Sequence, residues 1–256
     1  MDNLESQRPS SDNAAEFAWQ RDDVFGRIAS RYDLLCDVFS LGIHRLWKRR
    51  VAHHIASEPW TNLLDSATGT GDIILRLLAH ERIKGRRIVA SDVSAKVLAI
   101  AASKLRTAGD EVQLKQLDAE AMPSIADDSI DAYSISLCLK ICNRRAALTE
   151  ALRVLRPGGR LIVLEASNIP WQPLQQAYLA YMAVCMPVLG WIATGGDASA
   201  YPYLLQGIRE FPSAEVLAEE MSALGFEQVS FERLSRGIVA IHQARKPAGG
   251  VGVDAV

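Results

Sequence analysis

Leu63-Leu-Asp-Ser-Ala-Thr-Gly-Thr-Gly-Asp-Ile-Ile-Leu75 is the stretch that decides the fold. It starts as a short apolar run, turns through two glycines, and continues with apolar residues at helical spacing. A strand, a tight loop and a helix in this order begin a βαβ unit. Small residues suit such a loop, because backbone amides approach a ligand only where no side chain intervenes.

Four further apolar runs follow the loop, and each interval between them has room for a helix. They are residues 87–91, 112–117, 130–135 and 160–164. The clearest helix is 144–155, where Leu148, Leu152 and Leu155 recur at helical spacing before Arg156-Pro-Gly-Gly159. This alternation predicts an α/β fold with a mostly parallel sheet and helices on both faces.

The last apolar stretches of the chain predict a different strand arrangement. Residues 228–234 and 238–243 are β-rich and follow a helix expected between Ser213 and Leu224. Two adjacent strands joined by a short turn pair antiparallel. We therefore expect a mixed sheet whose edge is antiparallel.

Length, charge and cysteine usage limit the remaining choices. A chain of 256 residues fits one α/β domain, which we place at 21–246, with a disordered start at 1–20 and a flexible Gly-rich tail at 247–256. The net charge of −2 gives no field for a nucleic acid. Four scattered cysteines and the lack of an apolar leader predict reduced thiols, no metal site and a cytoplasmic location.

One long stretch of the sequence carries no charge. Between Glu165 and Asp197 there is no Asp, Glu, Lys or Arg, and Pro187 and Gly190 interrupt the part that approaches the length of a bilayer span. We expect 166–210 to form an apolar cap over an oily pocket, with contact to a membrane surface left open. A buried core helix is the alternative.

The chemistry begins with Asp92, which ends the second expected strand about 20 residues after the Gly-rich loop. An acid in this place accepts hydrogen bonds from ribose hydroxyls, so loop and acid together indicate an adenosine ligand. The loop lacks the last glycine of G-x-G-x-x-G, which argues against a dinucleotide and an NAD dehydrogenase. Asp118-Ala119 and Ser136 end the third and fourth strands at the same edge of the sheet.

Several longer stretches resemble the ubiquinone/menaquinone C-methyltransferase family over about 24–244. They are Phe25-Gly-Arg-Ile-Ala-Ser-Arg-Tyr-Asp-Leu-Leu35, Ser40-Leu-Gly-Ile-His-Arg-Leu-Trp47, the Gly-rich loop, Leu155-Arg-Pro-Gly-Gly159, the Tyr201 to Pro212 segment and Gly237-Ile-Val-Ala-Ile-His242. The resemblance implies a Rossmann-like class I methyltransferase that uses S-adenosylmethionine to methylate a ring carbon of a prenylated quinol precursor. The expected cofactor-binding residues are Asp65, Gly69, Thr70, Gly71, Asp92, Val93, Asp118, Ala119 and Ser136.

The acceptor side departs from this family. Leu137-Cys-Leu-Lys-Ile-Cys142 stands where family members carry Phe-Gly-Leu-Arg-Asn-Val, so Lys140 replaces an arginine. We expect Lys140 to be catalytic by stabilising a phenolate, with a solvated lysine as the alternative. The resemblance also places Tyr32 near the active site, in a segment expected to cover the cofactor, and makes it the second candidate catalytic residue, with a packing tyrosine as the alternative. The departures keep a phospholipid amine or a secondary metabolite open as the acceptor.

The histidines are expected to be structural or solvated. His242 lies in an apolar strand, and His44, His53 and His54 fall beside the basic Trp47-Lys-Arg-Arg50, which predicts a solvated helix face or a contact with anionic headgroups. The expected partner is an apolar small molecule and not nucleic acid, and a homodimer is left open. A non-catalytic binder of the nucleoside is the remaining alternative to an enzyme.

Overall fold

A seven-stranded sheet organises the computed structural model, which describes residues 32–79, 85–194 and 200–249. The strand order is β3-β2-β1-β4-β5-β7-β6, and all pairs from β3 to β5 are parallel. The strands are β1 (Asn62–Ser66), β2 (Arg87–Asp92), β3 (Val112–Gln116), β4 (Ile130–Ser136), β5 (Leu155–Ala166), β6 (Glu227–Leu234) and β7 (Val239–Arg245). The predicted mostly parallel sheet is confirmed.

The antiparallel part of the sheet holds β6 and β7, as predicted, but only β6 lies at the edge. β7 pairs antiparallel with β5 on one side and with β6 on the other. The final strand is therefore inserted beside the parallel strands, where most of its side chains are buried. Its run Val-Ala-Ile-His is apolar enough for that interior position.

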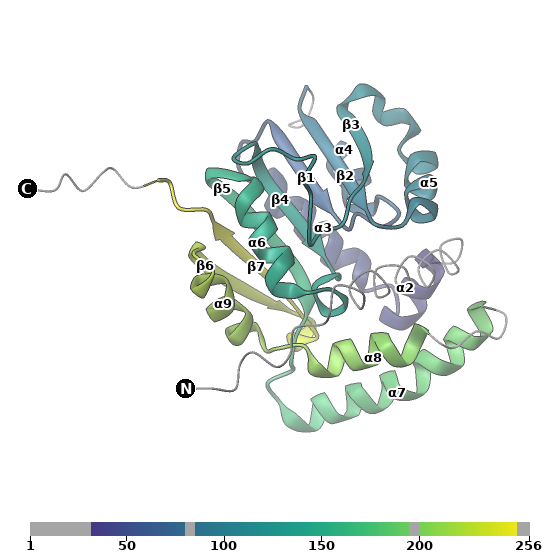
Figure 1. The fold of residues 1–256 in the computed structure, drawn as a ribbon. Helices are drawn as coiled ribbons and strands as arrows, with labels where there is room; N and C mark the ends of the chain where they lie inside the picture. The colour runs from purple at the N-terminus through teal and green to yellow at the C-terminus, as the bar shows by residue number, and fades with distance from the viewer. Residues whose placement is uncertain (1–31, 80–84, 195–199, 250–256) are drawn as a thin grey trace, which may run out of the picture.

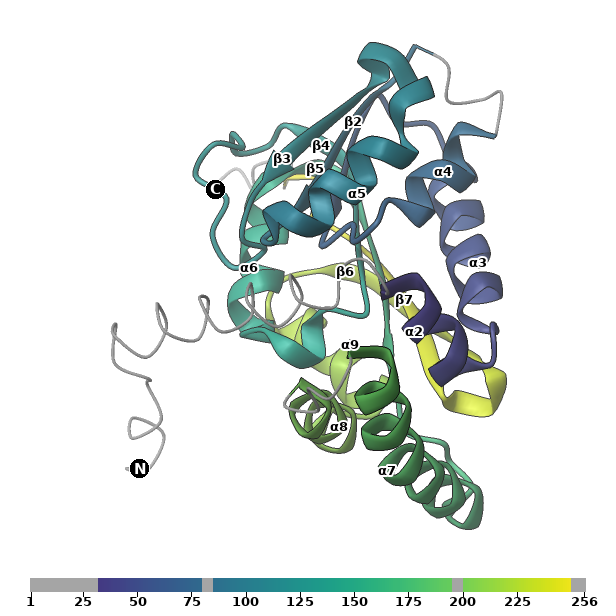
Figure 2. The ribbon, with the colours of Figure 1, turned by 90° about the vertical axis from the view of Figure 1, so that its right-hand side faces the viewer.

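Helices cover both faces of the sheet and form one apolar core on each (Figures 1 and 2). On one face, the core includes Val51, Ile74 and Ala101, from α3, α4 and α5. On the other face, Leu148 and Leu217 come from α6 and α9. The bounds are α3 (His44–Ala56), α4 (Asp72–Leu78), α5 (Ala95–Lys104), α6 (Arg144–Val154) and α9 (Ala214–Ala223).

The loop between β1 and α4 requires glycine at its end. Gly71 precedes α4 with a φ of 82°, in the left-handed region where a side chain is strained. A Cβ atom there would also lie 3.0 Å from Leu105 Cδ1. Gly71 thus lets α4 begin directly after the turn, close to the end of α5.

Three helices outside these layers lie at the carboxyl end of the parallel strands. They are α2 (Tyr32–Ser40), α7 (Gln172–Thr194) and α8 (Ala200–Glu210). α7 packs against α2 and α8 (Figure 1), and Met182 and Met186 of α7 are buried against Phe39, Tyr178, Leu205 and Ile208. The apolar cap over 166–210 stays a prediction, and the alternative of a buried core helix does not fit α7, which exposes Val184 and Trp191 to solvent.

α7 continues through Pro187, which the sequence predicts to interrupt it. Proline removes one hydrogen bond of the helix, and here the ring is exposed while the neighbouring Met182 and Met186 anchor the inner face. Packing therefore holds both halves of α7 together. None of the described helices combines the length and the apolar character that crossing a bilayer requires.

Some of the predictions concern residues or side chains that the structure does not describe. The disordered start at 1–20 and residues 250–256 of the expected tail lie outside the described residues, as does the side chain of Tyr32. Residues 247–249 form no helix or strand.

Candidate functional site

A cavity of about 630 Å³ lies between the carboxyl ends of the strands and the helices α2, α3 and α7. It has a polar wall made by residues that end the strands, and an apolar wall made by the helices. Of the predicted site residues, the cavity is lined by Gly69, Asp92, Val93, Asp118, Ala119, Ser136 and Lys140. Asp65, Thr70 and Gly71 do not line it but hold the loop that does.

Asp92 ties the Gly-rich loop to the end of β2. One carboxylate oxygen, Oδ2, accepts a hydrogen bond from the Gly69 amide at 3.0 Å, and Oδ1 accepts one from the Ser94 amide at 3.0 Å. The two bonds fix the carboxylate at the cavity wall beside Val93. An anion oriented in this way is suited to accept hydrogen bonds from a sugar diol.

Asp65 lies beneath the loop and is fully buried. Its carboxylate accepts hydrogen bonds from the hydroxyls of Ser134 at 2.5 Å and Thr68 at 2.7 Å. Burial raises the pKa of Asp65 to about 6, although both hydrogen bonds act in the opposite direction. Asp65 therefore shapes the loop from below.

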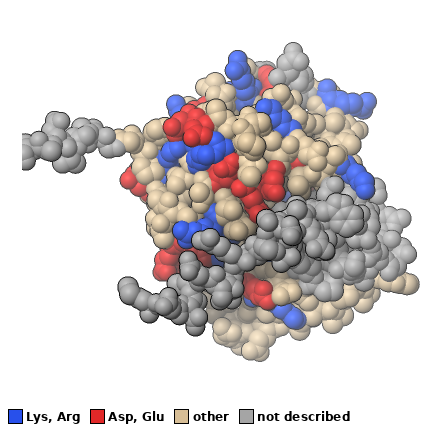
Figure 3. All heavy atoms as spheres, viewed as in Figure 1, with Lys and Arg blue, Asp and Glu red and all other residues tan. Residues whose placement is uncertain are grey.

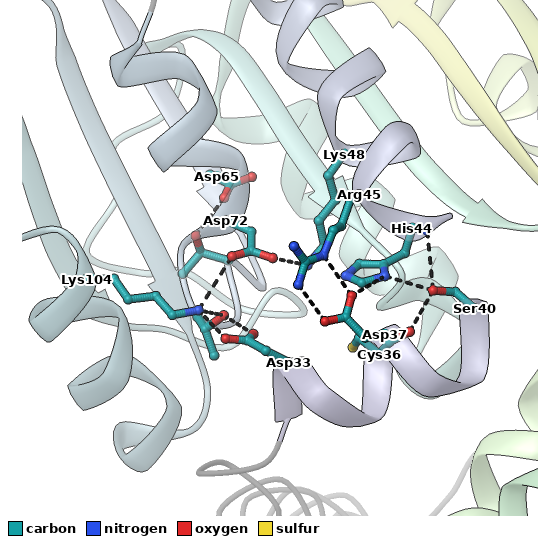
Figure 4. Close-up of polar contacts among 12 residues, drawn as sticks. Asp33, Cys36, Asp37, Ser40, His44, Arg45, Lys48, Asp65, Asp72 and Lys104 are labelled. Carbon is teal, nitrogen blue, oxygen red and sulfur yellow. Dashed lines mark hydrogen bonds and ion pairs between the residues drawn. The ribbon is translucent and has the colours of Figure 1, made fainter. Parts of the chain in front are cut away.

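Thr70 connects the loop to α2 through a group of charged residues, of which Figure 4 labels Asp33, Asp72 and Lys104. Its hydroxyl donates to Asp33 Oδ1 at 2.7 Å and accepts from Lys104 Nζ at 2.8 Å. Lys104 also forms ion pairs with Asp33 and, at 3.5 Å, with Asp72. Asp72 pairs with Lys48 at 2.9 Å as well. Lys104 of α5 thus holds α2 against the loop, a role that the sequence analysis missed, and Lys48 of α3 holds the start of α4.

The ends of β3 and β4 add two different polar groups. Asp118 accepts a hydrogen bond from the Glu120 amide at 3.0 Å, which orients the turn that places Ala119 on the cavity wall. Ser136 Oγ is buried and has no hydrogen-bond partner among the described residues, although Ser136 lines the cavity. A buried hydroxyl in such a place is satisfied when a ligand fills the cavity.

Lys140 is held by a buried ion pair. It lies in the short helix η4 (Leu139–Ile141), and its Nζ donates to Glu165 Oε1 at 3.0 Å and to the Leu137 carbonyl oxygen. Both side chains are buried, so the alternative of a solvated lysine is wrong. Glu165 is the counter-charge that the sequence analysis missed, because the two residues are 25 positions apart.

The sequence analysis predicts His44 on a solvated helix face, and the structure shows that this prediction is wrong. His44 is only 4% exposed and lines the cavity at the start of α3. Its Nδ1 lies 2.8 Å from Ser40 Oγ and 3.8 Å from Asp37 Oδ1 (Figure 4). The prediction failed because the turn after α2 directs this residue inward while Arg45 and Leu46 face solvent.

The helices complete the cavity with apolar and aromatic side chains. α7 contributes Tyr178, Tyr181, Met182 and Met186 to the lining. Burial raises the pKa of Tyr178 to about 12, so this phenol stays protonated at neutral pH. The arrangement offers a polar wall to one ligand group and an oily chamber to another.

Two remaining expectations concern His242 and the cysteines. His242 is buried on β7, where its Nε2 lies 2.8 Å from the Ala214 carbonyl oxygen, which makes it a structural histidine. The cysteines of the described part form no disulfide. Within the same ranges, no cluster of His, Cys, Asp or Glu could hold a metal ion.

Comparisons with known proteins place this site in context. Residues 14–246 match the model of the ubiE/COQ5 methyltransferase family. The chain is 42% identical over 227 residues to the ubiquinone/menaquinone biosynthesis C-methyltransferase UbiE of Paracoccus denitrificans, covering 87% of this chain and 89% of the relative. It is 38% identical over 244 residues to UbiE of Stutzerimonas stutzeri, covering 93% and 92%.

Solved structures agree on the fold. The [4+2]-cyclase SpnF has a TM-score of 0.64 at 21% identity, covering 91% of this chain and 97% of that chain. An S-adenosylmethionine-dependent methyltransferase of Thermotoga maritima has a TM-score of 0.60 at 20% identity, covering 88% and 99%. These likenesses confirm the predicted Rossmann-like class I fold.

Proposed function

The chain belongs to the ubiE/COQ5 methyltransferase family, and on that premise we propose that it methylates a ring carbon of a prenylated quinol precursor in ubiquinone or menaquinone biosynthesis. It is an S-adenosylmethionine-dependent methyltransferase. The observation that carries the proposal is the single cavity that joins the strand-end acids to an apolar helical chamber.

The residues of the polar wall fit S-adenosylmethionine. Asp92 stands where ribose hydroxyls would donate to its carboxylate, and Gly69 leaves the loop backbone accessible. Ser136 Oγ is a buried hydroxyl that a bound ligand would satisfy. When bound, S-adenosylmethionine would supply a methyl group attached to a positively charged sulfur. An electron-rich carbon of the acceptor attacks this methyl group, and the sulfur is the leaving group.

The helical wall fits an acceptor with an apolar tail. Tyr178, Met182 and Met186 surround the chamber, and a volume of about 630 Å³ is in the range of a single small-molecule pocket. We propose that a long prenyl tail of the acceptor extends out of this cavity past α7. The position of the ring would bring it beside Ser136 and Lys140 at the end of β4.

Lys140 remains our candidate for stabilising the phenolate form of the acceptor. Two of its three N–H donors are used by Glu165 and the Leu137 carbonyl oxygen, which holds the ammonium in one orientation. The nearby carboxylate offsets its positive charge, so we propose that Lys140 orients the ring oxygen more than it promotes ionisation. Tyr32 begins α2 and keeps its proposed place near the donor.

The direct test is an assay with purified protein, labelled S-adenosylmethionine and either demethylmenaquinol or the demethylated ubiquinone precursor. We expect labelled methyl on the ring of at least one of them. Donor binding without transfer to either quinol would reject this acceptor. Transfer of label to a phospholipid amine in the same assay would identify the alternative acceptor instead.

Calorimetry with S-adenosylhomocysteine tests the donor site separately. Asp92→Ala removes the carboxylate and releases Gly69, so we expect product affinity to fall about 10- to 100-fold, the range for losing hydrogen bonds to a charged group. Glu219→Ala is the matched control, because Glu219 is an exposed acid on α9. Unchanged binding in Asp92→Ala would contradict the assignment.

The outer face of α7 supports a second proposal, that the enzyme rests on a lipid bilayer. The 23 residues of α7 include no charged side chain, and Val184, Val188 and Trp191 are 66%, 53% and 59% exposed on one face. Figure 3 shows few charged residues over the lower part of the molecule, where Figure 1 places α7 and α8. A bilayer covers such a face and also carries the prenylated acceptor.

Flotation with phosphatidylethanolamine/phosphatidylglycerol vesicles tests this surface. The wild type should float with the vesicles, and Val184→Glu/Val188→Glu should not, while keeping its affinity for S-adenosylhomocysteine. If the wild type stays in the soluble fraction, the proposed contact of α7 with a bilayer is wrong. If the wild type sediments as a dimer and the double variant as a monomer, the exposed face of α7 would be the interface with a second copy of the chain.

A further inference from the structure

We propose that His44 is the general base that removes the proton from the ring hydroxyl of the acceptor. This inference rests on the proposed function and adds to it a catalytic residue. Methyl transfer to carbon needs an ionised hydroxyl, and a phenol with an ordinary pKa near 10 stays protonated unless a base takes its proton. The cavity therefore needs a neutral base with an accessible atom.

The turn between α2 and α3 places His44 in the cavity wall. Gly42 has a φ of 76°, which lets the chain reverse so that Ser40 at the end of α2 faces His44 at the start of α3. His44 is buried from bulk solvent but lines the cavity together with Ser40 and Ile43. A ligand in the cavity can reach the ring.

Hydrogen bonds fix which ring nitrogen carries the proton. Ser40 Oγ donates its only proton to the Cys36 carbonyl oxygen at 2.6 Å, so toward His44 it can act only as an acceptor. Nδ1 therefore carries the proton and donates it to Ser40. Nε2 is left as the basic nitrogen, and it has no hydrogen bond with any residue that the structure describes.

The charges around the ring keep it neutral at rest and support it once protonated. Burial, and then the Lys48 cation, hold the pKa of His44 below its usual range, and Arg45 adds a smaller effect in the same direction. The Asp37 and Asp72 carboxylates oppose them. Asp37 accepts two hydrogen bonds from Arg45, and its Oδ1 lies 3.8 Å from Nδ1, where it offsets part of the charge of an imidazolium that forms during the reaction.

Four other titratable groups of the lining are less suited to this step. Asp92 and Asp118 already accept backbone amides on the donor side. Lys140 is a cation in an ion pair, and Tyr178 is a weak acid whose pKa burial raises to about 12. Among the described residues that line the cavity, His44 is the one neutral imidazole.

The proton balance of the step is complete without an oxidant. His44 Nε2 takes the hydroxyl proton, and the electron pair of the resulting phenolate makes the ring carbon nucleophilic. The carbon–methyl bond forms as the sulfur–methyl bond breaks, and sulfur keeps the electron pair. The ring carbon then loses its hydrogen to solvent, and the imidazolium returns its proton to the ring oxygen, so one proton is released overall.

Two substitutions distinguish the proposed catalytic role of His44 from its structural role in the cavity wall. His44→Asn keeps a donor at the position of Nδ1 for Ser40 but removes Nε2, and His44→Gln brings an amide that cannot accept a proton. General-base catalysis contributes about 10²- to 10⁴-fold, so we expect kcat to fall at least 100-fold in both variants. The affinity for S-adenosylhomocysteine should stay within threefold. His53→Gln, an exposed histidine on the same helix, is the control with unchanged kcat.

A rescue experiment distinguishes a base from a packing residue. In His44→Ala, added imidazole should restore kcat at least 10-fold, with a saturating concentration dependence and a larger effect above pH 7. The wild type must first methylate the quinol, since its failure would reject the proposed function and not this inference. Active wild type with His44→Asn and His44→Gln within threefold of its kcat would overturn the role of His44. Lost activity that imidazole does not restore, with weakened product binding, would also overturn it.

Discussion

The two walls of the cavity are built in different ways. The strand-end wall is made from carboxylates and small residues that bond to nearby backbone amides, as Asp92 does with Gly69 and Ser94. The helical wall is made by α2, α3 and α7, whose side chains meet across large distances in the sequence. The first wall presents fixed hydrogen-bond acceptors, and the second presents apolar surface with one buried imidazole. A donor nucleoside and an oily acceptor need these two environments.

The largest effect is expected where the walls meet, at the ion pair of Lys140 and Glu165. Glu165→Gln leaves the Lys140 ammonium buried without a counter-charge, so we expect the free energy of unfolding to fall by about 3–5 kcal/mol in urea titration. Lys140→Met/Glu165→Leu removes both charges and should recover most of the loss. A Glu165→Gln variant within about 1 kcal/mol of wild type would show that this contact is not a buried pair.

A pH-dependent effect on stability is expected from Asp65, which lies beneath the strand-end wall. The pKa of Asp65 is raised from 3.8 to about 6 on folding, so the folded state favours the protonated form. Its contribution to stability is complete below pH 4 and is lost as the pH rises through 6. Relative to Asp65→Asn, the wild type should lose about 2 kcal/mol between pH 4.5 and pH 7 in urea titrations. Parallel pH profiles would contradict this environment.

The smallest effect concerns the contact that holds the helical wall to the strand-end wall. Lys104 pairs with Asp33 of α2, but Asp33 is 42% exposed and water screens the pair. A double-mutant cycle of Lys104→Met and Asp33→Asn should give a coupling of about 0.5–1 kcal/mol in S-adenosylhomocysteine binding, which 1 M salt reduces. Lys96→Met, an exposed lysine on α5, serves as the control. Zero coupling would mean that this ion pair does not help to hold α2 against the loop.

The difference between the walls also explains which site residues can be predicted from the sequence and which cannot. The strands and the Gly-rich loop follow from apolar runs and turn residues that are close in sequence, which is why Asp92 and Ser136 are found at the cavity. The inward position of His44 depends on how α2 and α3 pack, and the pairing of Glu165 on β5 with Lys140 depends on how η4 packs against the sheet. No local pattern in the sequence encodes either. The motif Ser40 to Trp47 carried a signal, since a serine and a histidine four residues apart around a glycine can share a hydrogen bond.

One cavity is expected to bring the methyl donor and the acceptor base together. A crystal structure of the protein with S-adenosylhomocysteine is the decisive experiment. We expect the ribose hydroxyls on the Asp92 carboxylate and the sulfur facing the space that His44 and Lys140 both border. A nucleoside bound elsewhere, or a sulfur turned toward the protein core, would contradict it.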